Sequence, residues 1–259
     1  MSFLQNLFKA KDATPAFEPP AVPVQLPNLT MQTAAQIAQA AEPGDAAKQL
    51  LTPQQTPSQY LAALQEKHLG GEMVKAMAHG MPDRSGVMWA VLSAQKVKEH
   101  LPSEELQAIQ AAHDWVKNPN PNTAAAAAAA AAKTDMMGPG ALAAQGAAWT
   151  QPASPVAAGA EGAPPPSRLT PHAVAGAVQL AAAIAADPKA AAPKLLAAVA
   201  QAAMPELPKP AAPAMPAAPD MPAAPALTIP PAIQEHMFKS QHPFIAMGLD
   251  IASGKTPVG

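Results

Sequence analysis

The chain has 259 residues, and its 16 basic and 18 acidic side chains give a formal net charge of −2. A nucleic-acid coat needs a positive excess to displace counterions, so we expect no nucleic-acid partner. The absence of cysteine excludes disulfides, thiol catalysis and cysteine metal sites. With 33 prolines, 14 glycines and only 3% aromatic residues, the composition predicts a small helical bundle with long Pro/Ala-rich linkers. No segment alternates with period two over the length of a strand, so the ordered part is predicted to be all-α.

Residues 1–11 are predicted to form a short amphipathic helix. Its apolar side carries Phe3, Leu4, Leu7 and Phe8. Such a face fits a groove on a protein partner or a membrane surface, and the scarcity of basic residues on its polar side favours the protein. A frayed terminus and a helix that folds back on the domain are the alternatives.

Targeting signals are not found in the sequence. The N-terminus lacks the basic n-region of a secretory signal, and the longest apolar run, residues 173–186, is too short to span a bilayer. We therefore expect a soluble, cytoplasmic protein without a transmembrane segment.

Residues 12–55 are predicted to be a disordered linker rich in Pro, Ala and Gln. Proline-rich patches lie at 15–27 and 43–57, with a weak helical candidate over residues 30–41 between them. Together with residues 1–11 this makes a disordered N-terminal region that tethers a docking helix.

A helical domain is predicted over residues 56–203. It opens at Thr56-Pro-Ser-Gln59, which has the pattern of a capping box with proline at the first helical position, and Gly70-Gly71 is expected to end this helix. Further helices are expected over residues 72–79, from Asp83, and over residues 103–117. The apolar stripe of the 103–117 helix is expected at Leu106, Ile109, His113 and Val116.

An alanine-rich part follows within the same domain. After the turn cluster 118–122, Thr123 is expected to cap a helix of nine alanines, because alanine has the highest helix propensity. Three more helices are expected, over residues 139–149, 170–186 and 187–203, with an internal Pro-rich break at 151–167.

A six-residue Pro-Ala repeat occupies residues 204–231. Proline fixes φ and removes a backbone donor, so this segment is expected to be an extended loop of roughly 3.1 Å per residue. A helix from about Pro243 to Ala252 follows. It is too short to be stable alone in water, so residues 232–259 are expected to pack back on the helical domain.

We find no catalytic, cofactor-binding or metal-binding constellation, and predict that the protein is not an enzyme. Gly254-Lys-Thr256 resembles the end of a phosphate-binding loop, but no helix follows it. The seven histidines are scattered, without the spacing that places two rings on one helical face. Glu104 and Glu105 fall in the first turn of a helix, where the helix dipole explains them.

Arg84 and Trp89 are the second candidate for a partner contact. They place a cation and an indole near a helix start, as in a recognition patch. The competing interpretation, which we favour, makes Trp89 a core residue and lets Arg84 bind carbonyl groups at the preceding turn, since few aromatic residues could otherwise fill a core.

Several short motifs follow one another in a distinctive order. Met81-Pro-Asp-Arg-x-x-x-x-Trp89 precedes a helix ending in Trp115-Val, then Asn-Pro and an alanine-rich helix. A terminal Gly248-Leu-Asp-Ile-Ala-x-Gly254 completes the set. In this order they resemble an uncharacterised bacterial all-helical family of unknown function, over about residues 56–203 and 241–254. The pure polyalanine run and the hexapeptide insertion depart from it.

The resemblance brings no catalytic residues. It implies that the last helix returns to the bundle, and it associates the chain with secretion-type or envelope assemblies. The residues that this return would bury are Phe244, Ile245, Leu249 and Ile251.

Two functions from different classes follow from these patterns. The first is a non-enzymatic adaptor or accessory protein of a bacterial multiprotein assembly, which binds a protein partner through the N-terminal helix. The second is a phasin-like or peripheral coat protein that lays its alanine-rich amphipathic helices on an apolar or membrane surface.

Overall fold

The computed structural model describes residues 21–134, 136, 138–150, 169–188 and 231–256. Every regular element among these residues is helical, which confirms the all-α prediction. In chain order the helices are α2 (Ala34–Ala41), α3 (Asp45–Lys48), α4 (Pro57–Glu66), α5 (Gly70–Gly80), α6 (Asp83–Lys96), the 3₁₀ turn η1 (Lys98–His100), α7 (Ser103–Lys117), α8 (Pro121–Ala131), α9 (Pro139–Ala148), α10 (Thr170–Ala186) and α12 (Pro231–Ala252).

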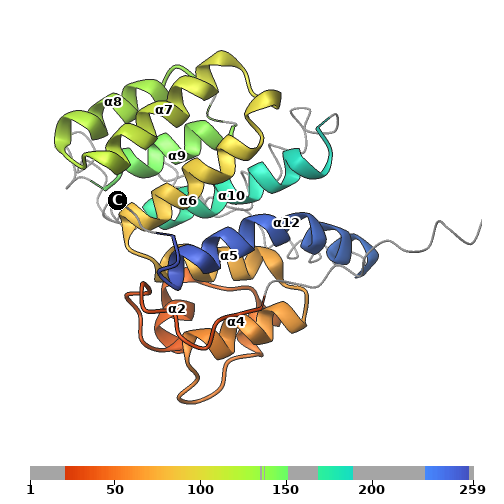
Figure 1. Ribbon diagram of the computed structural model, residues 1–259. Coiled ribbons are helices and arrows are strands. Elements are labelled where there is room, and N and C mark those ends of the chain that lie inside the picture. The colour runs from red at the N-terminus through yellow and green to blue at the C-terminus, as the bar shows by residue number, and fades with distance from the viewer. Residues whose placement is uncertain (1–20, 135, 137, 151–168, 189–230, 257–259) are drawn as a thin grey trace, which may run out of the picture.

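The helices are stacked in layers (Figure 1). Helices α7, α8 and α9 form one outer layer, and α6 and α10 lie beneath it. Helices α5 and α12 pack on the other side of α10, and α2 and α4 cover α5. The middle layers are therefore covered on both faces, and their side chains form the centre of the core.

Most helix starts lie where local signals predict them. Thr56 caps α4 through a reciprocal pair of hydrogen bonds with Gln59, and Pro57 occupies the first helical position. Helix α6 begins at Asp83, and α7 spans the expected residues 103–117. Caps and N-terminal prolines act over a few residues, so they are visible in sequence without knowledge of the fold.

The disordered linker predicted over residues 12–55 is wrong for its described part, residues 21–55. These residues contain α2 and α3, and Leu29 and Ile37 are buried against the domain. Helix α2 is capped by Thr33 and lies inside the weak candidate over residues 30–41. The proline-rich composition led to the wrong prediction, because composition does not show which few apolar residues pack on a core. A few such contacts are enough to hold an irregular chain in place.

The boundary between α4 and α5 also differs from the prediction. Helix α4 ends at Glu66, before the expected Gly70-Gly71 stop, and His68 supplies the turn with a left-handed φ of 56°. Gly70 and Gly71 then begin α5. A Cβ on Gly70 would collide with the side chains of Gln241 and Phe238, so this glycine serves the close approach of α12.

The apolar stripe expected on α7 is partly wrong. Leu106 is 42% exposed, whereas Glu105 is only 3% exposed. One Glu105 carboxylate oxygen, Oε2, accepts hydrogen bonds from the backbone N–H groups of Gly140, at 2.7 Å, and Ala141, at 3.0 Å. A dipole within its own helix therefore does not explain Glu105, because its carboxylate caps the N-terminus of α9.

The polyalanine helix is present as α8, but its cap is Asn120 in place of Thr123. The Asn120 side chain accepts hydrogen bonds from the backbone of Asn122 and Thr123, and Thr123 binds back to the Asn120 N–H. Pro121 takes the first helical position, so the expected turn cluster 118–122 already contains the first residues of the helix.

Helix α12 begins at Pro231 and contains Pro243 in its interior, whereas the sequence predicted a start near Pro243. It packs against α5, α6 and α10. Phe244, Ile245, Leu249 and Ile251 are each at most 2% exposed, as the family resemblance implied. The predictions for residues 1–20, 151–167, 189–203 and 204–230 lie outside the described residues.

Candidate functional site

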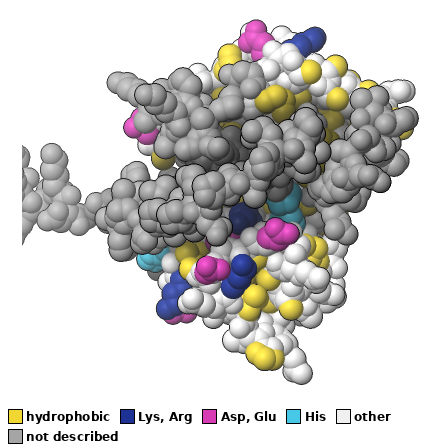
Figure 2. Space-filling view, turned by 180° about the vertical axis from the view of Figure 1, so that it is seen from behind, with side chains coloured by type: hydrophobic (Ala, Val, Ile, Leu, Met, Phe, Trp, Pro, Cys, Tyr) yellow, Lys and Arg dark blue, Asp and Glu magenta, His cyan; other side chains and the backbone are white. Residues whose placement is uncertain are grey.

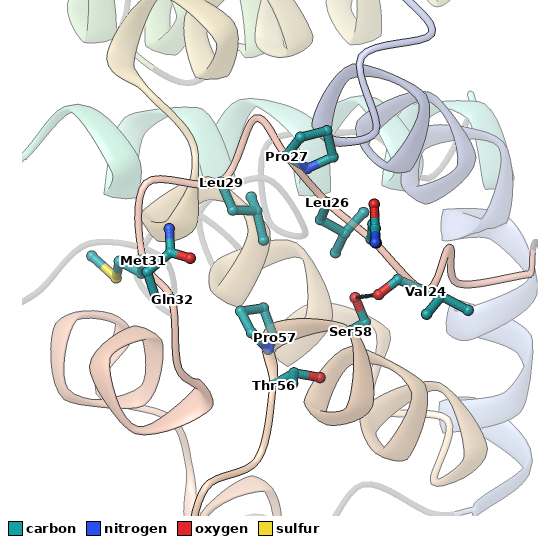
Figure 3. A pocket seen from close by; sticks show the side chains of 10 residues that line it. Val24, Leu26, Pro27, Leu29, Met31, Gln32, Thr56, Pro57 and Ser58 are labelled. Carbon is teal, nitrogen blue, oxygen red and sulfur yellow. Dashed lines mark hydrogen bonds between the residues drawn. The ribbon is translucent and has the colours of Figure 1, made fainter.

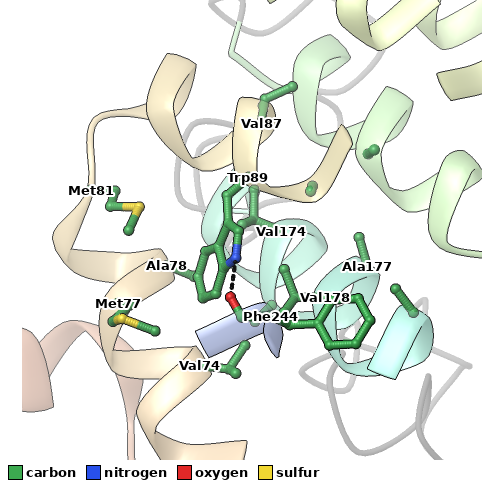
Figure 4. Close-up of a cluster of buried hydrophobic side chains, with 14 of the residues drawn as sticks. Val74, Met77, Ala78, Met81, Val87, Trp89, Val174, Ala177, Val178 and Phe244 are labelled. Atoms are coloured by element: carbon green, nitrogen blue, oxygen red, sulfur yellow. Dashed lines mark hydrogen bonds between the residues drawn. The ribbon is translucent and has the colours of Figure 1, made fainter. Parts of the chain in front are cut away.

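Trp89, a predicted partner contact, is a core residue. It is 0% exposed, and its indole N–H donates a hydrogen bond of 2.9 Å to the carbonyl oxygen of Phe244 (Figure 4). Val74, Met77 and Val178 surround it. Burial leaves Trp89 no surface to offer a partner, so it joins α6 to α12 as the core interpretation predicted.

Arg84 lies half-buried near the start of α6. Its Nε donates a hydrogen bond of 2.8 Å to the carbonyl oxygen of Val116, in the last turn of α7. The prediction placed the acceptor at the turn that precedes α6, whereas the structure places it at the end of α7. A cation is favourable there because a helix C-terminus carries partial negative charge.

The other four candidates, Phe3, Leu4, Leu7 and Phe8, lie outside the described residues. The structure does describe a segment further along the chain, residues 21–33, which we name the strap.

The strap is fastened to two helix ends. The Asn28 backbone N–H donates to the carbonyl of Ala252 at 3.0 Å, and the Asn28 side chain donates to that of Ile251 at 2.7 Å. The backbone N–H and the hydroxyl of Thr30 both donate to the carbonyl of Gly80, at 2.8 and 3.1 Å. The strap therefore closes the C-terminal ends of α12 and α5 at once.

A shallow cavity of about 310 Å³ lies between the strap and the start of α4 (Figure 3). Leu26, Leu29 and Pro57 supply apolar surface. The Ser58 hydroxyl donates a hydrogen bond of 2.9 Å to the Val24 carbonyl and fixes the rim, while the Val24 side chain remains 90% exposed. Gln25, Gln32 and Thr56 add polar but uncharged groups to the lining, so the cavity offers hydrogen bonds and apolar contacts but no ion pair.

Two histidines meet next to the strap, and neither was predicted as a site residue. His79, in the last turn of α5, lies edge to face with His172, in the first turn of α10, at 4.6 Å between ring centroids. His79 is 7% exposed, and its Nε2 is buried without a hydrogen-bond partner. Burial, with His172 and Lys75 nearby, lowers the pKa of His79 to about 3.

Charged groups border the histidine pair. Burial lowers the pKa of His172, which the Glu42 carboxylate at the end of α2 partly offsets and Lys75 reinforces. Lys75 forms an ion pair of 3.2 Å with Glu72. The Glu72 charge and, above all, burial raise the pKa of Tyr60 to about 12. At neutral pH the site is therefore two neutral imidazoles beside a Glu–Lys pair.

Charged and histidine side chains gather near the middle of the face seen in Figure 2. A second histidine cluster lies at α12, where Phe238 stacks on His68 at 5.0 Å and lies edge to face with His242 at 4.3 Å between ring centroids. Burial, together with His68 and Lys239, lowers the pKa of His242. His242 is thus a further buried imidazole whose neutral form is favoured.

Residues 60–206, more than half of the chain, match a family of unknown function (DUF6931). The chain belongs to this family. That confirms the resemblance noted in its motifs. No curated protein and no solved structure matches the chain. The DUF6931 match begins within α4 and ends before α12, so the strap and α12, which are hydrogen-bonded to each other, both lie outside it.

Two features are absent from the described part of the chain. None of its helices combines the length and the apolar character that a membrane crossing needs. Within the same residues, no three His, Cys, Asp or Glu side chains are grouped as ligands of one metal ion.

The histidine pair was missed because its members are far apart in the DUF6931 sequence. His79 and His172 lie on different helices, and no spacing rule relates them. Each has one weak local signal: His79 precedes the glycine that ends α5, and His172 follows the proline that opens α10. Only the packing of α5 against α10 brings the two rings together.

Proposed function

We propose that this DUF6931 protein is a non-enzymatic, cytoplasmic adaptor, an accessory component of a bacterial multiprotein assembly of the secretion or envelope type. It binds its protein partner through residues 1–11, with Phe3, Leu4, Leu7 and Phe8 as the contact face. Arg84 and Trp89 are left out of this interface, because they join helices within the domain.

The strap is the observation that carries this proposal. Its hydrogen bonds to Gly80, Ile251 and Ala252 fasten residues 28–30 to the domain. A tethered peptide binds with the benefit of an effective concentration set by its connector, so a firmly attached connector supports a docking role for the residues that precede it in sequence.

The alternative, a coat protein that lies on an apolar surface, has less support from α8. The buried face of the polyalanine helix, with Ala124, Ala127 and Ala131, already packs on α7 and α9. A coat helix needs its apolar face available for the surface, whereas in α8 that face is already buried within the domain.

The test compares two matched double variants of the full chain. Phe3→Ser with Leu7→Ser removes half of the apolar face, whereas Gln5→Ser with Asn6→Ser changes the opposite side of the same helix. Each is used as bait, captured proteins are identified by mass spectrometry, and the leading partner is purified and its affinity measured. We expect the first variant to weaken binding by at least tenfold and the second to bind like the unmodified chain.

Equal affinity for the two variants would contradict docking through this helix. Flotation with protein-free liposomes provides the second readout. Flotation of the unmodified chain that persists without residues 1–11 would favour the coat protein over the adaptor.

A further inference from the structure

The histidine pair and the strap meet at the end of α5. His79 directly precedes Gly80, the residue whose carbonyl accepts both hydrogen bonds from Thr30. Leu29 covers Gly80 so closely that an added Cβ would lie 3.2 Å from the Leu29 side chain. The contact of the strap with α5 therefore depends on the position of the last turn of α5.

That last turn depends on a neutral His79. His79 is only 7% exposed, its ring packs against His172, and its buried Nε2 has no hydrogen-bond partner to which an added N–H could donate. Lys75 of α5 opposes charging of both rings. Glu42 of α2 acts on His172, Glu72 is engaged with Lys75, and strap residues 28–30 bring no titratable side chain. Protonation would leave an uncompensated cation in the interface between α5 and α10.

We propose that His79 and His172 form an acid-sensitive latch that holds the strap on α5 and opens, on protonation, at the last turn of α5. Opening removes the Gly80 carbonyl from Thr30 and frees this end of the strap from α5, while Asn28 stays bound to α12 and Val24 to Ser58. The latch rests on the proposed function only for its purpose, which is to loosen one attachment of the segment that follows residues 1–11 in sequence.

The direction of the pH effect follows from the proton affinities of the two forms. In the closed form the pKa of His79 is about 3, whereas a solvent-exposed imidazole has a value of 6.5. The open form therefore binds the proton more tightly. The latch is closed above pH 6.5, and below it the open population rises by roughly tenfold per pH unit for one histidine, and by more when His172 also takes up a proton.

Amide hydrogen exchange of the full chain, followed by NMR between about pH 7.5 and about pH 4.5 and corrected for intrinsic rates, tests the latch. The Thr30 amide reports the bond to α5, and the Asn28 amide reports the bond to α12. We expect Thr30 protection to fall by roughly tenfold per pH unit below pH 6.5. Asn28 protection should fall less, and α7 amides should not change beyond the intrinsic correction.

Three variants make the test specific. His79→Gln with His172→Gln should abolish the extra pH dependence at Thr30. If the double variant does not fold, as judged by circular dichroism, the single variant His172→Gln takes its place. It changes a half-buried residue and should reduce the extra pH dependence. The matched control, His100→Gln, changes an exposed histidine and should leave it unchanged.

Constant Thr30 protection across this range would overturn the latch. So would acid exposure of α7 and the strap together, which indicates global unfolding, or an unchanged pH profile in a folded histidine variant. None of these readouts involves a partner. The result on the latch is therefore the same whether or not the N-terminal variants lose partner binding.

Discussion

Around Trp89, where α5, α6, α10 and α12 meet, the core is filled by large side chains, whereas between α7, α8 and α9 it is filled largely by alanine. We name these regions the Trp89 junction and the alanine layer. Trp89, Met77 and Phe244 are each at most 2% exposed in the first. In the second, residues such as Ala127 and Ala144 are equally buried.

The two regions obtain stability in different ways. A large buried side chain contributes through the apolar area that it removes from water and through many dispersion contacts. An alanine contributes little area, so the alanine layer depends on close backbone approach and on satisfied helix ends, as with Glu105 at the start of α9. The junction should therefore suffer most from removed atoms, and the layer most from added ones.

The largest effect is expected for Trp89→Ala. The substitution leaves a cavity among four helices and removes the donor to the Phe244 carbonyl, so we expect unfolding to become easier by about 3–5 kcal/mol. Denaturant unfolding followed by circular dichroism measures it. Trp89→Phe, which keeps most of the ring volume and loses the N–H, should recover part of that loss. A cost below about 1 kcal/mol for the alanine variant would contradict the core role.

The second prediction adds one methyl group to the alanine layer. A Cβ on Gly140 would lie 2.5 Å from the Glu105 carbonyl oxygen and 2.9 Å from the Ile109 side chain. Gly140→Ala should therefore destabilise the protein by about 1–3 kcal/mol, by overpacking.

Gly71→Ala is the matched control for Gly140→Ala. Gly71 is likewise the second residue of its helix, and its nearest neighbour lies 3.9 Å from the added Cβ. The control should be neutral or stabilising by up to about 1 kcal/mol, since alanine is the better helix former. Equal costs at the two glycines would remove the distinction between the regions.

Local features of the helices could be predicted from the sequence, whereas contacts between distant helices could not. Helix starts at Thr56, Asp83 and Ser103 follow from caps and prolines, which act within one turn. The buried side of α7 was assigned to Leu106, because a leucine is expected inside and a glutamate outside. Glu105 is buried instead, because two backbone N–H groups at the start of α9 donate to its carboxylate. The apolar periodicity of α7 carries no information about a hydrogen-bond partner 35 residues further along the chain.

The candidate site was harder to predict than the fold. Trp89 was identified as a core residue from the scarcity of aromatic residues alone. The strap was missed because it is held by hydrogen bonds from Asn28 and Thr30 to helix ends 50 or more residues away in sequence, with little apolar patterning. The His79–His172 contact has the same origin in packing between helices.

A third prediction tests the cap of the alanine layer. Glu105→Gln keeps the shape of the side chain and removes the charge that faces the α9 N-terminus, at a cost of about 1–2 kcal/mol in the free energy of unfolding. Glu104→Gln, at the exposed neighbouring position, should change it by less than about 0.5 kcal/mol. If the two costs are equal, the capping bonds do not stabilise the layer.

The smallest effects are expected at the caps that each region displays to solvent. Thr56 caps α4, which covers α5 in the layers joined through the Trp89 junction, and Asn120 caps α8 in the alanine layer, each through reciprocal bonds with the third helical residue. Because a cap acts through local backbone geometry, Thr56→Ala and Asn120→Ala should each cost about 1 kcal/mol whatever the packing beneath. Thermal and denaturant unfolding of the two variants measure this. A cost at Asn120 well above that at Thr56 would mean that the alanine layer depends on its helix ends more than the large-side-chain core does, and would sharpen the difference between the two regions.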